Sequence, residues 1–215
     1  NDYIICLVRT QPAEENRHAG LSQIIIDLKR DGAKVRPIKN MAGGEDFNEV
    51  VFEDVVVPKD RIVGEAGNGW AQVTSELAYE RSGPERFLSA FRVFVELVRF
   101  CGPEPTQYQA TVIGRIASHI MTLRRMSISV AGMLESGKDV VVEAALVKEL
   151  GNNFEKLLPE LARVVGSDGF SDFSRDGDLF RRTFEDTMLL SPSFTLRGGT
   201  REILRGVIAR GLGLR

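Results

Sequence analysis

The chain contains few of the residues on which several common kinds of site depend. Among its 215 residues are only two histidines and two cysteines. His18 and His119 lie far apart, and no Cys-x-x-Cys or His-x-x-x-His spacing occurs. We therefore predict no metal centre and no Ser-His-Asp triad. His18 is interpreted as a solvated loop residue and His119 as a residue that packs between helices.

A large excess of one charge and long apolar runs are also missing. The 28 basic and 30 acidic side chains give a formal net charge of −2, which argues against nucleic acid as the main partner. The longest apolar runs, such as residues 24–26 and 55–57, are too short to span a bilayer. Cys6 and Cys101 are far apart in apolar contexts, which indicates a reducing compartment and no disulfide framework.

The first part of the chain alternates short β-branched runs with turn signals. Pro37 restricts the third run to a sheet edge, and Arg30-Asp31-Gly32 forms a turn before it. Pro58-Lys59-Asp60 ends the last run. The predicted strands are residues 3–10, 21–28, 35–38 and 48–57.

The apolar period shifts toward 3.6 residues after about residue 66, which indicates helices. The predicted helices are residues 68–100, 105–135, 140–165, 179–190 and 200–210. Long helices joined by short loops favour an antiparallel bundle. The predicted fold class is therefore α+β and mainly α, with a partial antiparallel β-domain (residues 1–65) followed by an antiparallel four-helix bundle (residues 66–215).

A charged pair within the first predicted helix precedes a helix-breaking dipeptide. On pattern alone, Glu80 and Arg81 are one step of a solvated helix face. However, Pro84 has no N–H, so the carbonyl of Glu80 loses its intrahelical partner, and Gly83 loosens the same turn. A proline in a helix interior costs roughly 3 kcal/mol. We therefore predict a kink directly beside a carboxylate.

A second candidate is the segment Arg197-Gly-Gly-Thr-Arg-Glu202, which precedes the last predicted helix. Thr200 is a good candidate for the helix N-cap, and free N–H groups at a helix start can bind a phosphate or a polar ring edge. On pattern alone, simple capping after a loop is the favoured interpretation. The chain has no Walker lysine loop, and neither of its glycine pairs Gly43-Gly44 and Gly198-Gly199 matches a dinucleotide fingerprint.

Several segments, taken together and in order, resemble the second half of an acyl-CoA dehydrogenase. The resemblance spans essentially the whole chain, and the combined order is more specific than any single piece. The segments that carry it are residues 3–10, 20–28, 48–58, 64–70, 197–205 and 208–210. It implies a flavoprotein oxidoreductase of fatty acid metabolism or lipid degradation with FAD as its cofactor. The family's N-terminal helical domain and the start of its β-domain would then precede Asn1, so we expect the chain to be a fragment.

The resemblance also implies a reaction, the α,β-dehydrogenation of an acyl-CoA thioester. In the family a carboxylate removes the α-proton while the β-hydride passes to flavin N5. Many members place this carboxylate directly before the Gly-Thr of the C-terminal signature, where this chain has Gly198. A second group, resembling isovaleryl-, long-chain-specific and bacterial steroid-degrading enzymes, places it on the first bundle helix before an arginine. Glu80 is accordingly implied as the base, with Arg81 as its neighbour on the substrate side.

The residues that the resemblance implies for the cofactor are only partly kept. Gly198, Gly199, Thr200 and Glu202 belong to the C-terminal signature. Val98 and Cys101 stand where the family has an arginine and a phenylalanine, and Arg163 stands where it has a glutamine. Arg163 is kept as a candidate contact to a flavin pyrophosphate through its charge. The surface offered to a neighbouring subunit's flavin is therefore expected to be degraded.

Two kinds of assembly fit these departures, a homotetramer with drifted contacts and a hetero-tetramer in which another chain completes the flavin site. Besides the acyl-CoA substrate, an electron-transfer flavoprotein is the implied redox partner, in the bacterial cytoplasm. The open alternatives are a non-catalytic or partner-dependent subunit and an acyl-CoA oxidase-like flavoenzyme.

Overall fold

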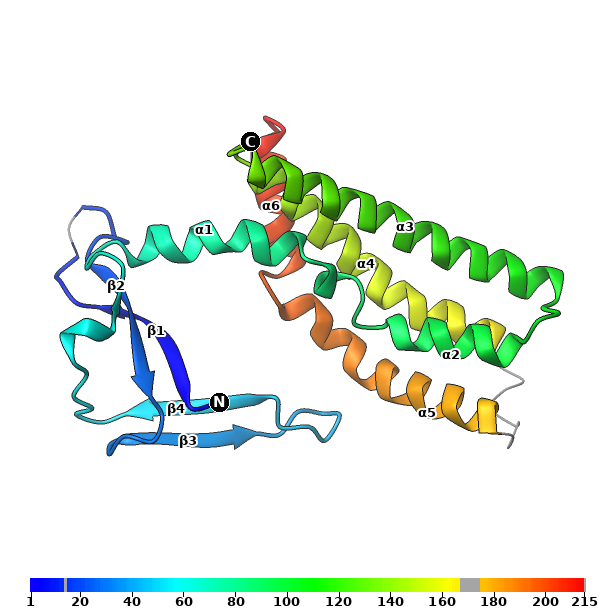
Figure 1. The fold of residues 1–215 in the computed structure, drawn as a ribbon, viewed down its shortest axis with the longest axis horizontal. Helices are drawn as coiled ribbons and strands as arrows, with labels where there is room; N and C mark the ends of the chain where they lie inside the picture. Colours follow the sequence, from blue (N-terminus) through cyan, green and yellow to red (C-terminus); the bar gives the residue numbers. More distant parts are fainter. Residues whose placement is uncertain (14, 167–174, 215) are drawn as a thin grey trace. The chain divides into compact units, whose positions relative to one another are not determined.

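The computed structural model describes residues 1–13, 15–166 and 175–214 (Figure 1). It divides into two compact units, Asn1–Glu76 and Leu77–Arg215. The division falls inside helix α1 (Gly69–Ser82). The boundary at residue 65 therefore remains a prediction from the sequence.

The first unit contains a small antiparallel sheet in the order β1-β2-β5 and a separate two-stranded ribbon, β3-β4. In the first sheet Tyr3 lies opposite Asp27, and Arg9 lies opposite Leu21. The central strand is the most buried, with Ile26 only 4% exposed. The strands are β1 (Tyr3–Arg9), β2 (Leu21–Asp27), β3 (Ala33–Ile38), β4 (Phe47–Phe52) and β5 (Ile62–Val63), with a short 3-10 helix, η1 (Lys59–Arg61), before β5.

The four predicted strands are present, but the last one is shorter than predicted. β4 ends at Phe52, and the sequence pattern had extended it to residue 57. Asp54 adopts φ 51°, a left-handed conformation that a strand cannot contain. β5 was not predicted because two residues show no periodicity. The predicted turn is confirmed by the Ala33 N–H, which donates to the Arg30 carbonyl at 3.1 Å.

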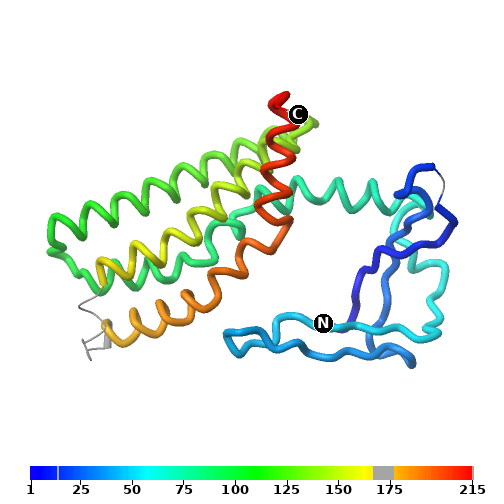
Figure 2. The backbone as a smooth tube through the Cα atoms, turned by 180° about the vertical axis from the view of Figure 1, so that it is seen from behind, coloured from blue at the N-terminus to red at the C-terminus, as the bar shows by residue number. Residues whose placement is uncertain are grey.

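The second unit is an antiparallel bundle in which successive helices run in opposite directions (Figures 1 and 2). This confirms the predicted fold class. α3 begins with a capping box between Thr106 and Gln109, which satisfies two donors at the helix start. Its inward face buries Val112, Ile116 and Leu123. The bundle helices are α2 (Phe91–Cys101), α3 (Gln107–Glu135), α4 (Val141–Val165) and α5 (Arg175–Leu190).

A shorter helix closes one end of the bundle. The chain leaves α5 through the 3-10 segment η4 (Ser191–Leu196) and continues into α6 (Arg201–Gly211), which packs on α4 (Figure 2). Two arginines fix this contact, because Arg201 and Arg205 each place a nitrogen 2.9 Å from Glu149 Oε1. Burial opposes ionisation of Glu149, but the hydrogen bonds from both arginines more than offset it and lower its pKa.

The predicted single helix over residues 68–100 is wrong. α1 ends at Ser82, a 3-10 turn η2 (Pro84–Arg86) follows, and α2 begins only at Phe91. Gly83 is extended, with φ −65° and ψ 153°. Pro84 cannot donate to the helix, and the hydroxyl of Ser127 on α3 donates to the Ser82 carbonyl at 2.6 Å. The predicted kink is thus a complete break.

The start of α5 also differs from the prediction. α5 begins at Arg175, whereas the sequence pattern began it at residue 179 after Asp176-Gly177. A glycine within a helix costs only about 1 kcal/mol, and packing of a long apolar face outweighs that. The other predicted helices agree with the structure to within about two residues.

A glycine in the middle of α4 allows η2 to lie against that helix. A Cβ atom built on Gly151 would stand 2.5 Å from the carbonyl oxygen of Arg86 and 3.2 Å from Cβ of Phe87. Phe87 itself is 2% exposed within the bundle core. The close approach therefore requires glycine at position 151, and it fixes where η2 sits.

None of the helices among residues 1–13, 15–166 and 175–214 is both long and apolar enough to cross a membrane.

Candidate active site

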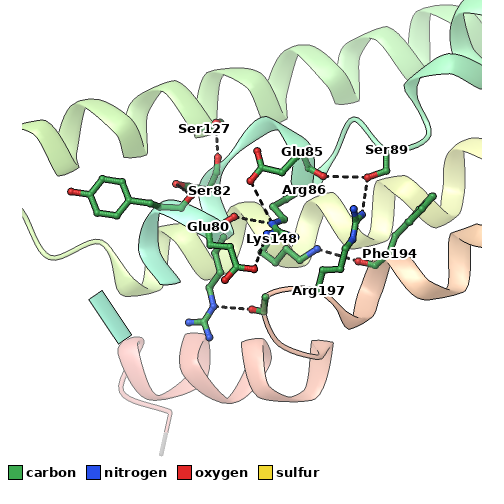
Figure 3. Close-up of polar contacts among 12 residues, drawn as sticks. Glu80, Ser82, Glu85, Arg86, Ser89, Ser127, Lys148, Phe194 and Arg197 are labelled. Carbon is green, nitrogen blue, oxygen red and sulfur yellow. Dashed lines mark hydrogen bonds and ion pairs between the residues drawn. The ribbon is translucent and has the colours of Figure 1, made fainter. Parts of the chain in front are cut away.

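The side chain of Arg86 binds both the main chain and the side chain of Glu80 (Figure 3). Arg86 Nε donates to the Glu80 carbonyl at 2.9 Å, and Arg86 Nη2 donates to Glu80 Oε1 at 2.7 Å. The break at Pro84 deprives that carbonyl of its helical donor, and the guanidinium replaces it. The Arg86 side chain is 11% exposed, while that of Glu80 is 38% exposed. The carboxylate is thus held from the protein side and open on the other.

The carboxylate of Glu80 lies beside the glycine turn that precedes α6. A Cβ atom built on Gly198 would stand 3.2 Å from Glu80 Oε1. Gly198 and Gly199 adopt φ 71° and 105°, conformations that favour glycine. Arg81 Nε donates to the Gly198 carbonyl at 3.0 Å and ties the turn to α1. Burial lowers the pKa of Arg81, an effect that the charge of Glu80 opposes.

A buried polar network lies behind this turn. Lys148 on α4 is fully buried, and its Nζ donates to Asn152 Oδ1 at 2.6 Å and to the Phe194 carbonyl at 3.2 Å. Glu155 is also fully buried, and it accepts the Ser89 N–H at 2.9 Å.

Arg197 joins this network to the glycine turn. Its Nη2 lies 3.5 Å from Glu155 Oε2 and donates to Ser89 Oγ at 2.7 Å. Lys148 and Arg197 therefore connect α4 to the last part of η4 and to the residue that follows it.

Burial changes the pKa values of both ionisable groups on α4. Desolvation lowers the pKa of Lys148 to about 8, although the charge of Glu155 opposes the shift. Desolvation raises the pKa of Glu155, against the effect of Ser89 and the two nearby cations. For both groups, burial favours the neutral form, while contacts with the oppositely charged partner favour the charged form.

The buried ammonium of Lys148 gives an expected pH dependence of stability. The unfolded chain binds the lysine proton more tightly between pH 8 and 10.5, so stability should rise with pH in that window. The shift corresponds to roughly 3 kcal/mol over the whole window. Thermal unfolding of wild type and Lys148→Met should show a melting-temperature difference that moves in favour of wild type as pH rises. Parallel pH profiles for the two proteins would contradict this.

The first turn of α6 contains the acidic residue Glu202. Thr200 occupies the N-cap position, as predicted, but its side chain makes no capping hydrogen bond. The pKa of Glu202 is lowered mainly by a hydrogen bond from the backbone N–H of Glu202 itself and, to a smaller extent, by one from the Thr200 hydroxyl. The negative charge therefore sits at the helix N-terminus, where it is favourable.

Arg163 does not belong to the cluster around Glu80. It lies in the last turn of α4, about 22 Å along the helix from Lys148 at 1.5 Å per residue. Its Nη2 lies 3.1 Å from Glu160 Oε2 on the exposed face. Its predicted contact with a flavin of a neighbouring subunit stays a prediction.

The histidines and cysteines have structural surroundings. His18 lies in a loop, as predicted, but it is only partly exposed and stacks on Trp70 with ring centroids 4.0 Å apart. His119 on α3 packs against Phe154 on α4, as predicted. Within the described part of the chain no three His, Cys, Asp or Glu residues are arranged to hold a metal ion, and Cys6 and Cys101 are free thiols.

The structure brings together Glu80, Arg81, Gly198 and Gly199 from the predicted set, with Thr200 next in the chain. Sequence reasoning missed Arg86, Lys148, Glu155 and Arg197. One signal was available for Arg86, because the Glu80 carbonyl orphaned by Pro84 required a new donor.

Comparison with known proteins assigns the helical bundle to a family. Residues 67–213 match the family described as "Acyl-CoA dehydrogenase, C-terminal domain". The chain therefore belongs to the acyl-CoA dehydrogenase family.

One curated relative is "Acyl-CoA dehydrogenase IpdE1" of Mycolicibacterium smegmatis, 29% identical over 215 residues. The match covers 97% of this chain and 52% of that protein, so the chain spans about half the length of this relative.

Two solved structures share the fold over the whole chain. The "Tcur3481-Tcur3483 steroid ACAD" has a TM-score of 0.82 at 22% identity. The "ChsE4-ChsE5 complex from Mycobacterium tuberculosis" has a TM-score of 0.77 at 25% identity. The chain covers 57% of each of those chains.

Proposed function

We propose that the chain is the catalytic C-terminal part of an FAD-dependent acyl-CoA dehydrogenase in which Glu80 is the base. The observation that carries this is the position of the Glu80 carboxylate, whose Oε1 lies 3.2 Å from where a Cβ at position 198 would stand. This closeness supports the proposal, because the resemblance implies that other members carry their carboxylate at the position of Gly198. Family membership supports the reaction class.

The proposed reaction breaks two C–H bonds of the acyl group and forms one carbon–carbon double bond. Glu80 takes the α-proton on a carboxylate oxygen, and when bound the FAD would supply the acceptor for the β-hydride. Glu80 is suited to this because its carboxylate is accessible and its orientation is held by Arg86. Arg81 would act on the substrate side by fixing the glycine turn through the Gly198 carbonyl.

The proposed place for the edge of the planar cofactor is the glycine turn. A Cβ atom on Gly199 would find no atom nearer than Arg81 Nη2 at 3.6 Å, so space remains beside the turn. Gly198, Gly199, Thr200 and Glu202 would hold the FAD edge at the start of α6. These residues form only one side of a flavin site.

We further propose an electron-transfer flavoprotein as the redox partner and a hetero-tetramer as the assembly. The substitutions Val98, Cys101 and Arg163 in the contacts to a neighbouring flavin support a second kind of subunit. The solved structure described as the ChsE4-ChsE5 complex also contains two kinds of chain, according to its name. A homotetramer is the competing assembly, and an oxidase-like enzyme is the competing activity.

A flavin-reduction experiment tests the proposed function. The protein is expressed from its complete reading frame, alone and with its genomic neighbours, and loaded with FAD. Anaerobic mixing with short, branched, long and steroid acyl-CoA thioesters should bleach the oxidised flavin for at least one substrate and form an equal amount of enoyl-CoA.

Three outcomes would change the proposal. Absence of bleaching with every thioester, in every assembly, would contradict the dehydrogenase function. A yellow, active protein purified alone would remove the hetero-tetramer. Rapid reoxidation of the reduced flavin by oxygen would favour the oxidase.

A further inference from the structure

Arg86 makes two hydrogen bonds to Glu80 and lies closer to it than to any other acidic side chain among the described residues. Its guanidinium reaches the carbonyl oxygen of Glu80 at 2.9 Å and its carboxylate at 2.7 Å. Among the described residues, the other carboxylate that pairs with Arg86 is Glu85, which lies 3.6 Å away and is more than half exposed. The two contacts to one residue define both the main-chain position and the side-chain direction of Glu80.

These two hydrogen bonds matter because Glu80 lies in the last turn of α1, which ends two residues later. α1 ends at Ser82, and Pro84 cannot give an N–H to the Glu80 carbonyl. A residue at a helix end has fewer backbone restraints than one in its middle. Without Arg86, the Glu80 carboxylate would have no protein hydrogen bond among those that the described residues make.

Arg86 is itself held in place by the packing of η2. Its backbone lies against Gly151 of α4, where a Cβ would come within 2.5 Å of the Arg86 carbonyl oxygen. Its side chain is 11% exposed, and it has Lys148 among its charged neighbours. The guanidinium fork spans two acceptors at once, which a lysine ammonium on a flexible stem cannot do with the same geometry.

We propose that Arg86 is a positioning residue that aims the Glu80 carboxylate past the Gly198 turn. This rests on the proposed function, because the direction of Glu80 matters to the reaction only if Glu80 is the base. Arg86 acts through Glu80 and takes no proton itself. Its removal should therefore lower kcat more than it raises KM.

The test compares Arg86→Gln, Arg86→Lys and Arg86→Ala in the full-length, FAD-loaded protein. A misplacement of about 1 Å can cost on the order of 100-fold, so Arg86→Gln should lower kcat by about 10- to 100-fold with little change in KM. The kcat of Arg86→Lys should lie between that of Arg86→Gln and that of wild type. Added guanidinium at low concentration should raise the turnover of Arg86→Ala and leave that of wild type unchanged.

Arg182→Gln is the matched control. Arg182 forms an exposed ion pair with Asp178 on α5, 2.8 Å long, and its loss should leave kcat unchanged. Melting temperatures and flavin content are measured for every variant, so that loss of folding is separated from loss of positioning.

The outcomes separate this proposal from the one on which it rests. If Glu80→Gln retains turnover, the proposed base is wrong whatever Arg86 does. If Glu80→Gln is inactive while folded Arg86→Gln keeps wild-type kcat, the base stands and the positioning role is overturned. An Arg86 defect confined to KM, or a failure of guanidinium to restore folded Arg86→Ala, would also overturn it.

Discussion

Moving the carboxylate from position 80 to position 198 should restore turnover that its removal abolishes. Glu80→Gln and Glu80→Gly are each expected to lower the rate of flavin reduction by about 1,000-fold, within the range for loss of a general base. In the double variant Glu80→Gly, Gly198→Glu, at least a tenfold recovery is expected. The reason is that a side chain at position 198 points into the space that Glu80 Oε1 occupies, 3.2 Å from its Cβ.

The recovery should be incomplete, because Gly198 has φ 71° and a glutamate there costs about 1–2 kcal/mol. The measurement is single-turnover flavin reduction under anaerobic conditions, with flavin content as the control for folding. Gly198→Glu alone is the matched control, and it should be impaired because two carboxylates would compete for one place. Wild-type rates in Glu80→Gln would show that another group takes the proton.

Replacing Gly151 by alanine should damage the site from inside the bundle. The new Cβ would stand 2.5 Å from the Arg86 carbonyl oxygen, a backbone atom that moves only if η2 moves. Overpacking of this kind costs about 1–3 kcal/mol, partly offset by the better helix propensity of alanine. Because η2 carries Arg86, the displacement should also lower turnover by about 10- to 100-fold.

Gly114→Ala is the matched control for Gly151→Ala. Gly114 is also inside a helix, but a Cβ there would meet no atom within 4 Å. It should stabilise the protein by about 1 kcal/mol through helix propensity alone and leave turnover unchanged. Melting temperature and kcat are measured for both variants. A Gly151→Ala protein as stable and active as wild type would mean that η2 does not depend on this close approach.

Helix positions followed from the sequence wherever periodicity and boundary residues agreed. α3 starts at its capping box and α4 ends before Gly166, close to where the pattern placed them. The stretch 68–100 failed because its apolar stripe continues through the Gly83-Pro84 break, so periodicity alone joined two helices into one. The conformation at Asp54 had no warning in the pattern and shortened β4.

The candidate site was predictable only where the chain itself marks it. The glycine pair at 198–199 and the Glu80-Arg81 step are local features of the sequence. The partners Lys148 and Glu155 lie on α4, and Arg197 lies about 40 residues further along the chain. The apolar pattern of α4 does not indicate that this helix contains buried charges. Their assembly depends on how α4 packs against η4, which is a tertiary property.

The close approach between Glu80 and Gly198 has a consequence for how such proteins can diverge. Under the proposed function, one acidic group fills the space, and positions 80 and 198 are two distant points on the chain from which it could be attached. A chain that moved the acid from one point to the other by single substitutions would pass through a form with neither acid or with two crowded ones. Positions 80 and 198 should therefore be compared as a pair when related sequences are ordered.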